Sequence, residues 1–129
     1  MITISLLTTA LLFGGMVLYS FGFAAFVFNA LPPETAGPTI RRAFPHFYLF
    51  VIGVSGVGAL MLWSVDPVAA LLMALIAFST IPTRQILMPA INKATDAREK
   101  RRFAVLHGVS VAITLIHILL AGIVLARFA

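Results

Sequence analysis

The fold of this chain is decided by the stretch NKATDAREKRR, residues 92–102, which lies between two long apolar segments. It contains five of the nine Lys and Arg residues and two of the four acidic residues of the protein. Each charge placed at the centre of a bilayer costs roughly 2.5–3.5 kcal/mol on insertion scales, so this stretch belongs in water. It therefore fixes the side of a membrane from which its two apolar neighbours start.

The composition is that of an integral membrane protein. Of the 129 residues, 61% are hydrophobic and 10% are charged, whereas about 25% of the residues in soluble domains are charged. Cysteine is absent, which excludes disulfides, thiolate metal sites and cysteine nucleophiles. The formal net charge of +5 comes from basic residues in loops between apolar segments. We therefore expect the lipid bilayer as a partner and no nucleic acid.

Four apolar segments are long enough to cross hydrocarbon, which takes about 20 helical residues. Their approximate bounds are 4–30, 44–63, 67–88 and 103–127. The first segment lacks the positive flank and the cleavage site of a signal peptide, so we expect it to be retained. The four apolar segments predict an all-α membrane protein. Because the connections between them are short, we expect a single domain over residues 1–129. The expected architecture is an antiparallel, up-down-up-down four-helix transmembrane bundle.

Basic residues are distributed unevenly between the two ends of this predicted bundle. Four spans place the loops 31–43 and 89–102 at one end together with Arg84, and both termini with Asp66 at the other. The first end carries eight Lys or Arg residues, and the second carries Arg127. The positive-inside rule therefore predicts a multi-pass protein with both loops in the cytoplasm and both termini in the periplasm.

Polar groups inside apolar segments are the first functional candidates, because hydrocarbon penalises them. His46, at the start of the second segment, and His107, one turn into the fourth, are expected at a similar depth near the cytoplasmic face. One interpretation is a proton-handling or ligand-binding site at these histidines, with Arg41, Arg42 and Arg84 available for an anion. The alternative is that each imidazole donates a hydrogen bond to a neighbouring helix and fixes its packing.

Other polar side chains lie near these histidines or deeper in the membrane. Ser110 lies three residues after His107, so it shares a helical face with it and is placed to hydrogen-bond to another helix. His117 lies about 15 Å further along the same segment, near mid-membrane, where Thr114 is the other polar group expected. Its two interpretations are a packing role and a single axial ligand of a haem. Tyr48 is expected at the membrane interface.

The sequence lacks the common catalytic and nucleotide-binding motifs. It has no phosphate-binding loop, dinucleotide fingerprint, paired carboxylates or zinc-protease motif. We therefore expect no catalytic set and no metal site. The second apolar segment carries a band of small residues from Gly53 to Ala59. Such a band favours close helix contacts, within one chain or between copies.

Two elements of the sequence carry a family resemblance: AG at 36–37 followed by RAFPHFY at 42–48, and FAVLHGVS at 103–110. These elements resemble the transmembrane protein 205-like family, whose bacterial members are described as domain of unknown function 4149. The resemblance implies a four-helix protein of the bacterial inner membrane without an established activity. Eukaryotic relatives are associated with resistance to platinum drugs, which implies export or trafficking. Carried over by motif, the functional positions are Arg42, Phe44, Pro45, Tyr48, His107 and Ser110.

A weaker likeness is to the HemJ-type protoporphyrinogen oxidases, which are small four-helix membrane proteins thought to hold haem on histidines. The first apolar segment of this chain has no histidine, and the Leu-Pro-Arg element of that family stands here as Leu31-Pro32-Pro33. If haem b is the cofactor, its ligands come from His46, His107 and His117.

The leading hypothesis is a non-enzymatic membrane protein that binds a small ligand or partner between helices near the cytoplasmic face. Arg42, Tyr48, His107 and His46 would frame this ligand, with Ser110, Arg41 and Arg84 nearby. A second hypothesis is a redox protein that binds haem or porphyrin. A third is an accessory subunit of a larger membrane complex, or a homo-oligomer.

Overall fold

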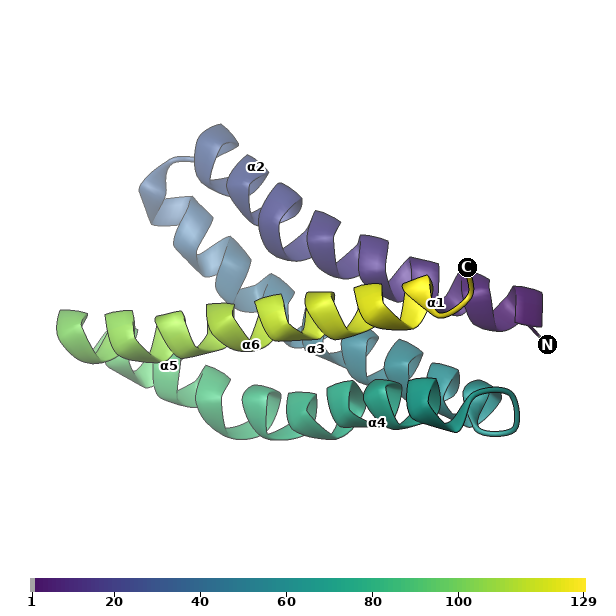
Figure 1. Cartoon of the computed structure of the whole chain (residues 1–129). Coiled ribbons are helices and arrows are strands. Elements are labelled where there is room, and N and C mark those ends of the chain that lie inside the picture. The colour runs from purple at the N-terminus through teal and green to yellow at the C-terminus, as the bar shows by residue number, and fades with distance from the viewer. Residues whose placement is uncertain (1) are drawn as a thin grey trace.

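The computed structural model describes residues 2–129, and it consists of four long helical spans joined by short turns (Figure 1). Each span is long and apolar enough to cross a membrane. Within residues 2–129 there is no β-strand, which confirms the predicted all-α class. The elements, of which η1 and η2 are π-helical, are in chain order α1 (Ile2–Val17), η1 (Leu18–Phe23), α2 (Ala24–Ala30), α3 (Pro33–Leu62), α4 (Pro67–Pro82), η2 (Thr83–Leu87), α5 (Met88–Asp96) and α6 (Lys100–Ala126).

The spans alternate in direction, as expected for an up-down-up-down bundle. α1 packs against α3 and α6, α3 packs against α4, and both α4 and α5 pack against α6. The C-terminus and the α3–α4 turn lie at the same end as the start of α1 (Figure 1). The α2–α3 and α5–α6 turns lie at the other end, which we call the basic end. There, α2 and the first part of α3 diverge from the hairpin of α5 and α6 (Figure 1).

The connections at the basic end are shorter than the sequence predicts. Instead of a loop over 31–43, α3 begins at Pro33, and instead of a loop over 89–102, α5 continues to Asp96. The predicted loops were too long because proline in a sequence usually indicates a turn. Proline is also tolerated in the first turn of a helix, which is where Pro33 and Pro89 lie. Lys and Arg are also good helix formers, so the helices continue beyond their apolar residues.

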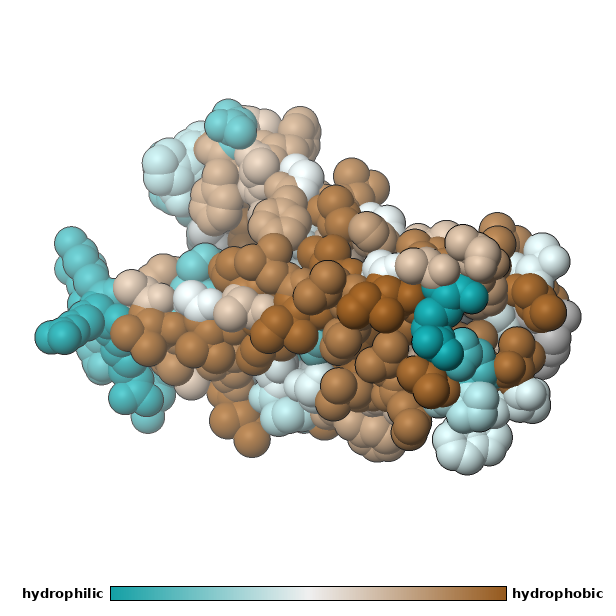
Figure 2. Space-filling view, in the orientation of Figure 1, coloured by the Kyte–Doolittle hydropathy of each residue, from teal (hydrophilic) through white to brown (hydrophobic). Residues whose placement is uncertain are grey.

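The core is mostly apolar, and so is most of the outer surface. Large exposed side chains include Leu60, which is 80% exposed, and Phe78, which is 71% exposed. Figure 2 shows apolar residues along the length of the molecule, with strongly hydrophilic side chains gathered at its ends. An exposed apolar surface of this extent suits lipid rather than water. The largest fully buried apolar side chains come from all four spans: Leu12, Met16, Phe47, Val51, Leu62, Met73, Ile76 and Val124.

The small residues of α3 face two different surroundings. A Cβ added at Gly58 would collide with the end of the Met73 side chain, so α3 and α4 approach each other closely there. A Cβ added at Gly53 or Gly56 would have open space around it. The predicted band from Gly53 to Ala59 therefore provides a close contact within the chain at Gly58. Association of its open side with a second copy or with a larger complex stays a prediction.

An ion pair joins the α3–α4 turn to the end of α6. The Asp66 carboxylate accepts hydrogen bonds from Arg127 Nε at 2.7 Å and from Nη2 at 3.0 Å. It also caps α4, because its Oδ1 accepts a hydrogen bond from the backbone N–H of Ala69 at 3.3 Å. The hydrogen bond with Arg127 holds the pKa of Asp66 below its usual range, and it raises the pKa of Arg127. This pair fastens the end of the bundle opposite the basic end.

We expect the ion pair to make stability depend on pH in the acid range. Because folding lowers the pKa of Asp66 from its ordinary value of 3.8, the pair stabilises the fold above about pH 4 and ceases to do so as the pH falls through the lowered pKa. The thermal unfolding midpoint in detergent should therefore fall more for the unmodified protein than for Arg127→Gln between about pH 5 and pH 2.5. Equal decreases would contradict the pairing.

Candidate functional site

Polar contacts between spans gather around Pro45, in the part of α3 near the basic end. Pro45 has no backbone N–H, so the α-helical hydrogen bond to the carbonyl of Arg41 is absent. Two side chains from other spans bond to this interrupted stretch. Tyr19 Oη donates to the Ala43 carbonyl at 2.9 Å, and Arg84 Nε donates to the Pro45 carbonyl at 3.2 Å. The first and third spans are thereby both tied to the second.

Each of these two donors lies in a π-helical turn. Tyr19 belongs to η1, and Arg84 belongs to η2. A π-helical turn inserts an extra residue into an α-helix and redirects its side chains, and such turns are frequent at functional sites. η2 begins directly after Pro82, whose missing N–H already interrupts the α-helical hydrogen-bond pattern. Local sequence thus favours a distortion that aims Arg84 at α3.

Aromatic rings line the same stretch of α3. Tyr19 stacks on Phe47 with ring centroids 5.1 Å apart, and it meets the edge of Phe44 at 5.8 Å. Phe44 in turn lies 6.2 Å from Tyr48. Phe47 and Tyr48 are buried, whereas Tyr19 and Phe44 are half-buried. The polar contacts at Pro45 therefore border an apolar wall of aromatic rings.

Arg84 is half-buried and has no carboxylate partner among residues 2–129. Within residues 2–129, the ion pairs are Arg41 with Asp96 and Arg127 with Asp66. Besides the bond to Pro45, Arg84 donates from Nη1 to the side-chain oxygen of Gln85 at 2.7 Å. Both acceptors are neutral. The charge of Arg84 is therefore unpaired within residues 2–129, with a partly buried hydrogen bond to Pro45 and an exposed one to Gln85.

The two arginines of α3 that the sequence predicts for an anion lie in different situations. Arg41 forms a two-pronged ion pair with Asp96 of α5, with nitrogen–oxygen distances of 2.7 and 2.9 Å. This pair joins the second and third spans at the basic end, so Arg41 already has its anion. Arg42 is exposed on α3. Sequence reasoning did not identify Asp96 as the partner, because the two residues are far apart in the chain.

The structure does not join the two histidines that are expected at similar depth. His46 and His107 are both exposed, and no hydrogen bond or ring contact links them among the described residues. His107 stacks on Phe103 with ring centroids 5.4 Å apart. Ser110 was predicted to hydrogen-bond to another helix. Instead, its hydroxyl donates to the carbonyl of His107 in its own helix, at 2.8 Å. A shared site for the two imidazoles stays a prediction.

His117 is buried and bonds to a neighbouring span. Its Nε2 lies 2.8 Å from Ser79 Oγ of α4. The Ser79 hydroxyl also lies 2.6 Å from the Leu75 carbonyl of its own helix. Sequence reasoning identified Thr114 alone at this depth and missed Ser79, although Ser79 begins the polar run Ser79-Thr80 in an otherwise apolar segment. Across residues 2–129, no group of three His, Asp or Glu is placed to hold a metal ion.

A family model described as Domain of unknown function (DUF4149) matches residues 7–100, which is more than half of the chain. No curated protein and no solved structure matches the chain. The matched range includes Tyr19, Pro45 and Arg84. It ends at the first residue of α6, so His107 and Ser110 lie outside it.

The hydrogen bond between Ser79 and His117 should contribute to stability. In Ser79→Ala the buried His117 loses its hydrogen-bond partner, so we expect the free energy of unfolding in detergent to fall by about 0.5–2 kcal/mol. The double variant Ser79→Ala with His117→Leu should recover part of this loss, because it removes both polar groups. Thr39→Ala is the control, since the hydrogen bond of Thr39 is exposed and lies within its own helix. An unchanged stability of Ser79→Ala would contradict the assigned bond.

Proposed function

The chain belongs to the DUF4149 family, and on that premise we propose that it binds a small anionic ligand between its second and third spans, near the basic end. Its four apolar spans make it a multi-pass membrane protein. The family description assigns no activity. The wider likeness to transmembrane protein 205-like proteins, and the weaker one to HemJ-type oxidases, stay predictions.

The observation that carries this proposal is the half-buried charge of Arg84. A guanidinium has five N–H donors, and hydrogen bonds to Pro45 and Gln85 use two of them. Three N–H donors, on Nη1 and Nη2, remain for a carboxylate or a phosphate. A charge held in a membrane span without a counter-charge is costly, so such residues usually serve binding or transport. A bound anion would neutralise Arg84.

The surroundings of Arg84 suggest what such a ligand carries besides its charge. The rings of Phe44 and Tyr48 lie on the α3 stretch to which Arg84 bonds, and they offer an apolar surface. Arg42 and His46 are exposed on the same stretch, where they can meet the polar part of a ligand. The ligand class that fits is therefore a small anion attached to a flat apolar body.

Histidine geometry gives less support to the haem alternative. The Nε2 atom of His117 is already hydrogen-bonded to Ser79, so binding iron through this nitrogen would break a partly buried hydrogen bond. His46 and His107 are exposed, without contact to each other among the described residues. A visible absorption spectrum of protein purified in mild detergent distinguishes the two proposals. A Soret band that disappears in His107→Ala would support haem.

We further propose that the basic end lies in the cytoplasm of a bacterium, with both termini in the periplasm and the spans in the inner membrane. Of the nine Lys and Arg residues, Arg127 lies at the opposite end, and the other eight lie in the half of the bundle nearer the basic end. The positive-inside rule supports this orientation.

Sodium benzoate is a simple probe for the Arg84 site, because it joins a carboxylate to an aromatic ring. Bound benzoate should raise the thermal unfolding midpoint in detergent by about 2–6 °C for a gain of ~1 kcal/mol. Benzyl alcohol has a similar size and no charge, so it should leave the midpoint unchanged. We expect Arg84→Gln to abolish the benzoate effect.

Lys93→Gln is the matched control for this measurement, because Lys93 is an exposed cation at the same end of the molecule. This variant should respond to benzoate as the unmodified protein does. An equal response of Arg84→Gln, or an equal effect of benzyl alcohol, would contradict an anion site at Arg84.

Orientation can be measured with single cysteines, since the chain contains none of its own. Ser64→Cys places a thiol in the α3–α4 turn, and Glu99→Cys places one in the α5–α6 turn. A maleimide that cannot cross the inner membrane should label Ser64→Cys in intact cells with a permeabilised outer membrane. It should label Glu99→Cys only after the inner membrane is disrupted. The opposite pattern would reverse the orientation.

A further inference from the structure

The cations of the α5–α6 turn take part in no ion pair among residues 2–129. Arg98, Lys100, Arg101 and Arg102 lie within five residues, and all four side chains are exposed. The one acidic residue among them is Glu99. Asp96, just before the turn, pairs with Arg41 of α3. Within residues 2–129, none of these four cations forms an ion pair.

The turn also has a defined shape. Glu99 N–H donates to the Ala94 carbonyl at 3.0 Å, and Arg98 N–H donates to the Thr95 carbonyl at 3.1 Å, which is the hydrogen-bond pattern of a Schellman motif. Arg98 has φ of 56°, in the left-handed region that this motif requires and that glycine usually fills. Arg98 thus occupies a backbone position where glycine would be less strained. The backbone of the turn therefore sets the order in which the charged residues enter α6.

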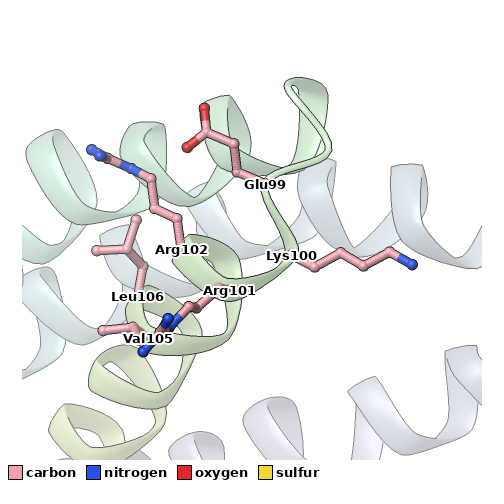
Figure 3. A pocket seen from close by; sticks show the side chains of 6 residues that line it. All are labelled: Glu99, Lys100, Arg101, Arg102, Val105 and Leu106. Atoms are coloured by element: carbon pink, nitrogen blue, oxygen red, sulfur yellow. The ribbon is translucent and has the colours of Figure 1, made fainter.

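These cations border a hollow with an apolar floor. The hollow is lined by Glu99, Lys100, Arg101, Arg102, Val105 and Leu106. Figure 3 shows Arg101 and Arg102 on either side of Val105 and Leu106, with Lys100 pointing the opposite way. Val105 is 61% exposed. The surface thus combines two guanidinium groups with an exposed apolar patch that begins the fourth span.

We propose that this hollow is a docking surface for an anionic phospholipid, with the headgroup phosphate between Arg101 and Arg102 and an acyl chain against Val105 and Leu106. Clusters of Lys and Arg next to a membrane span attract anionic lipid. A guanidinium binds phosphate through paired N–H donors. Free phosphate would satisfy the cations but leave the apolar floor uncovered, whereas a phospholipid matches both. This surface is separate from the Arg84 site, and the inference does not depend on it.

The inference can be tested by titrating the purified full-length protein with phosphatidylglycerol or phosphatidylcholine and counting bound lipids by native mass spectrometry. We expect a clear preference for phosphatidylglycerol. Arg101→Gln and Arg102→Gln should each weaken its binding roughly fivefold, and the double variant should weaken it more than tenfold. Phosphatidylcholine binding should be the same in all variants.

Two further variants separate a binding site from general charge and from loss of folding. Lys93→Gln removes an exposed cation that lies outside the hollow, so it should change the affinity less than twofold. Arg98→Gly removes a second cation outside the hollow and relieves the left-handed backbone, so it should also change the affinity less than twofold, without lowering the thermal midpoint.

Three results would overturn the inference. The first is equal affinity for the two lipids. The second is an equal loss in Lys93→Gln and Arg101→Gln, which would mean diffuse attraction to charge rather than a site. The third is displacement of phosphatidylglycerol by millimolar inorganic phosphate, which would make free phosphate the better ligand.

Discussion

Hydrocarbon offers no hydrogen bonds, so every polar group in a membrane span must find a partner in its own helix or in a neighbouring one. Most hydroxyl groups of this protein use their own helix. Thr9, Ser55 and Thr80 each donate to the carbonyl four residues earlier. Within residues 2–129, no buried side-chain nitrogen or oxygen lacks a partner. The few side chains that bond from one span to another therefore mark where the helices are held in a specific arrangement.

Two of these contacts converge on the stretch of α3 around Pro45. Proline removes a backbone donor there, and the carbonyls of Ala43 and Pro45 accept extra hydrogen bonds from Tyr19 and Arg84. Both donors belong to π-helical turns. The first and third spans are therefore distorted where they contact the proline-interrupted stretch of the second. Packing alone would be satisfied by neutral donors. Arg84 brings a positive charge as well, and this charge separates a binding interpretation of the site from a purely structural one.

Ion pairs close the molecule at both ends and explain which charges remain. Asp66 pairs with Arg127 at one end, and Asp96 pairs with Arg41 at the other. Both aspartates of the chain are thereby used within the fold. The remaining excess of cations lies at the basic end, next to exposed apolar side chains of α6 such as Val105. The asymmetry on which the proposed orientation rests thus also creates a surface suited to anionic lipid.

The sequence by itself determined the four spans, their alternation and the unequal charge of the two ends. Apolar length and basic residues predict these features because both report the free energy of moving side chains from water into hydrocarbon. Sequence reasoning also identified Arg84 and Tyr48 as candidates, but it missed Tyr19 and the partner of His117. Hydropathy gives the depth of a residue, not the rotation of its helix or the identity of its neighbour. Only the tertiary structure decided which polar side chains meet, because helix rotation depends on side-chain packing and on the π-helical turns.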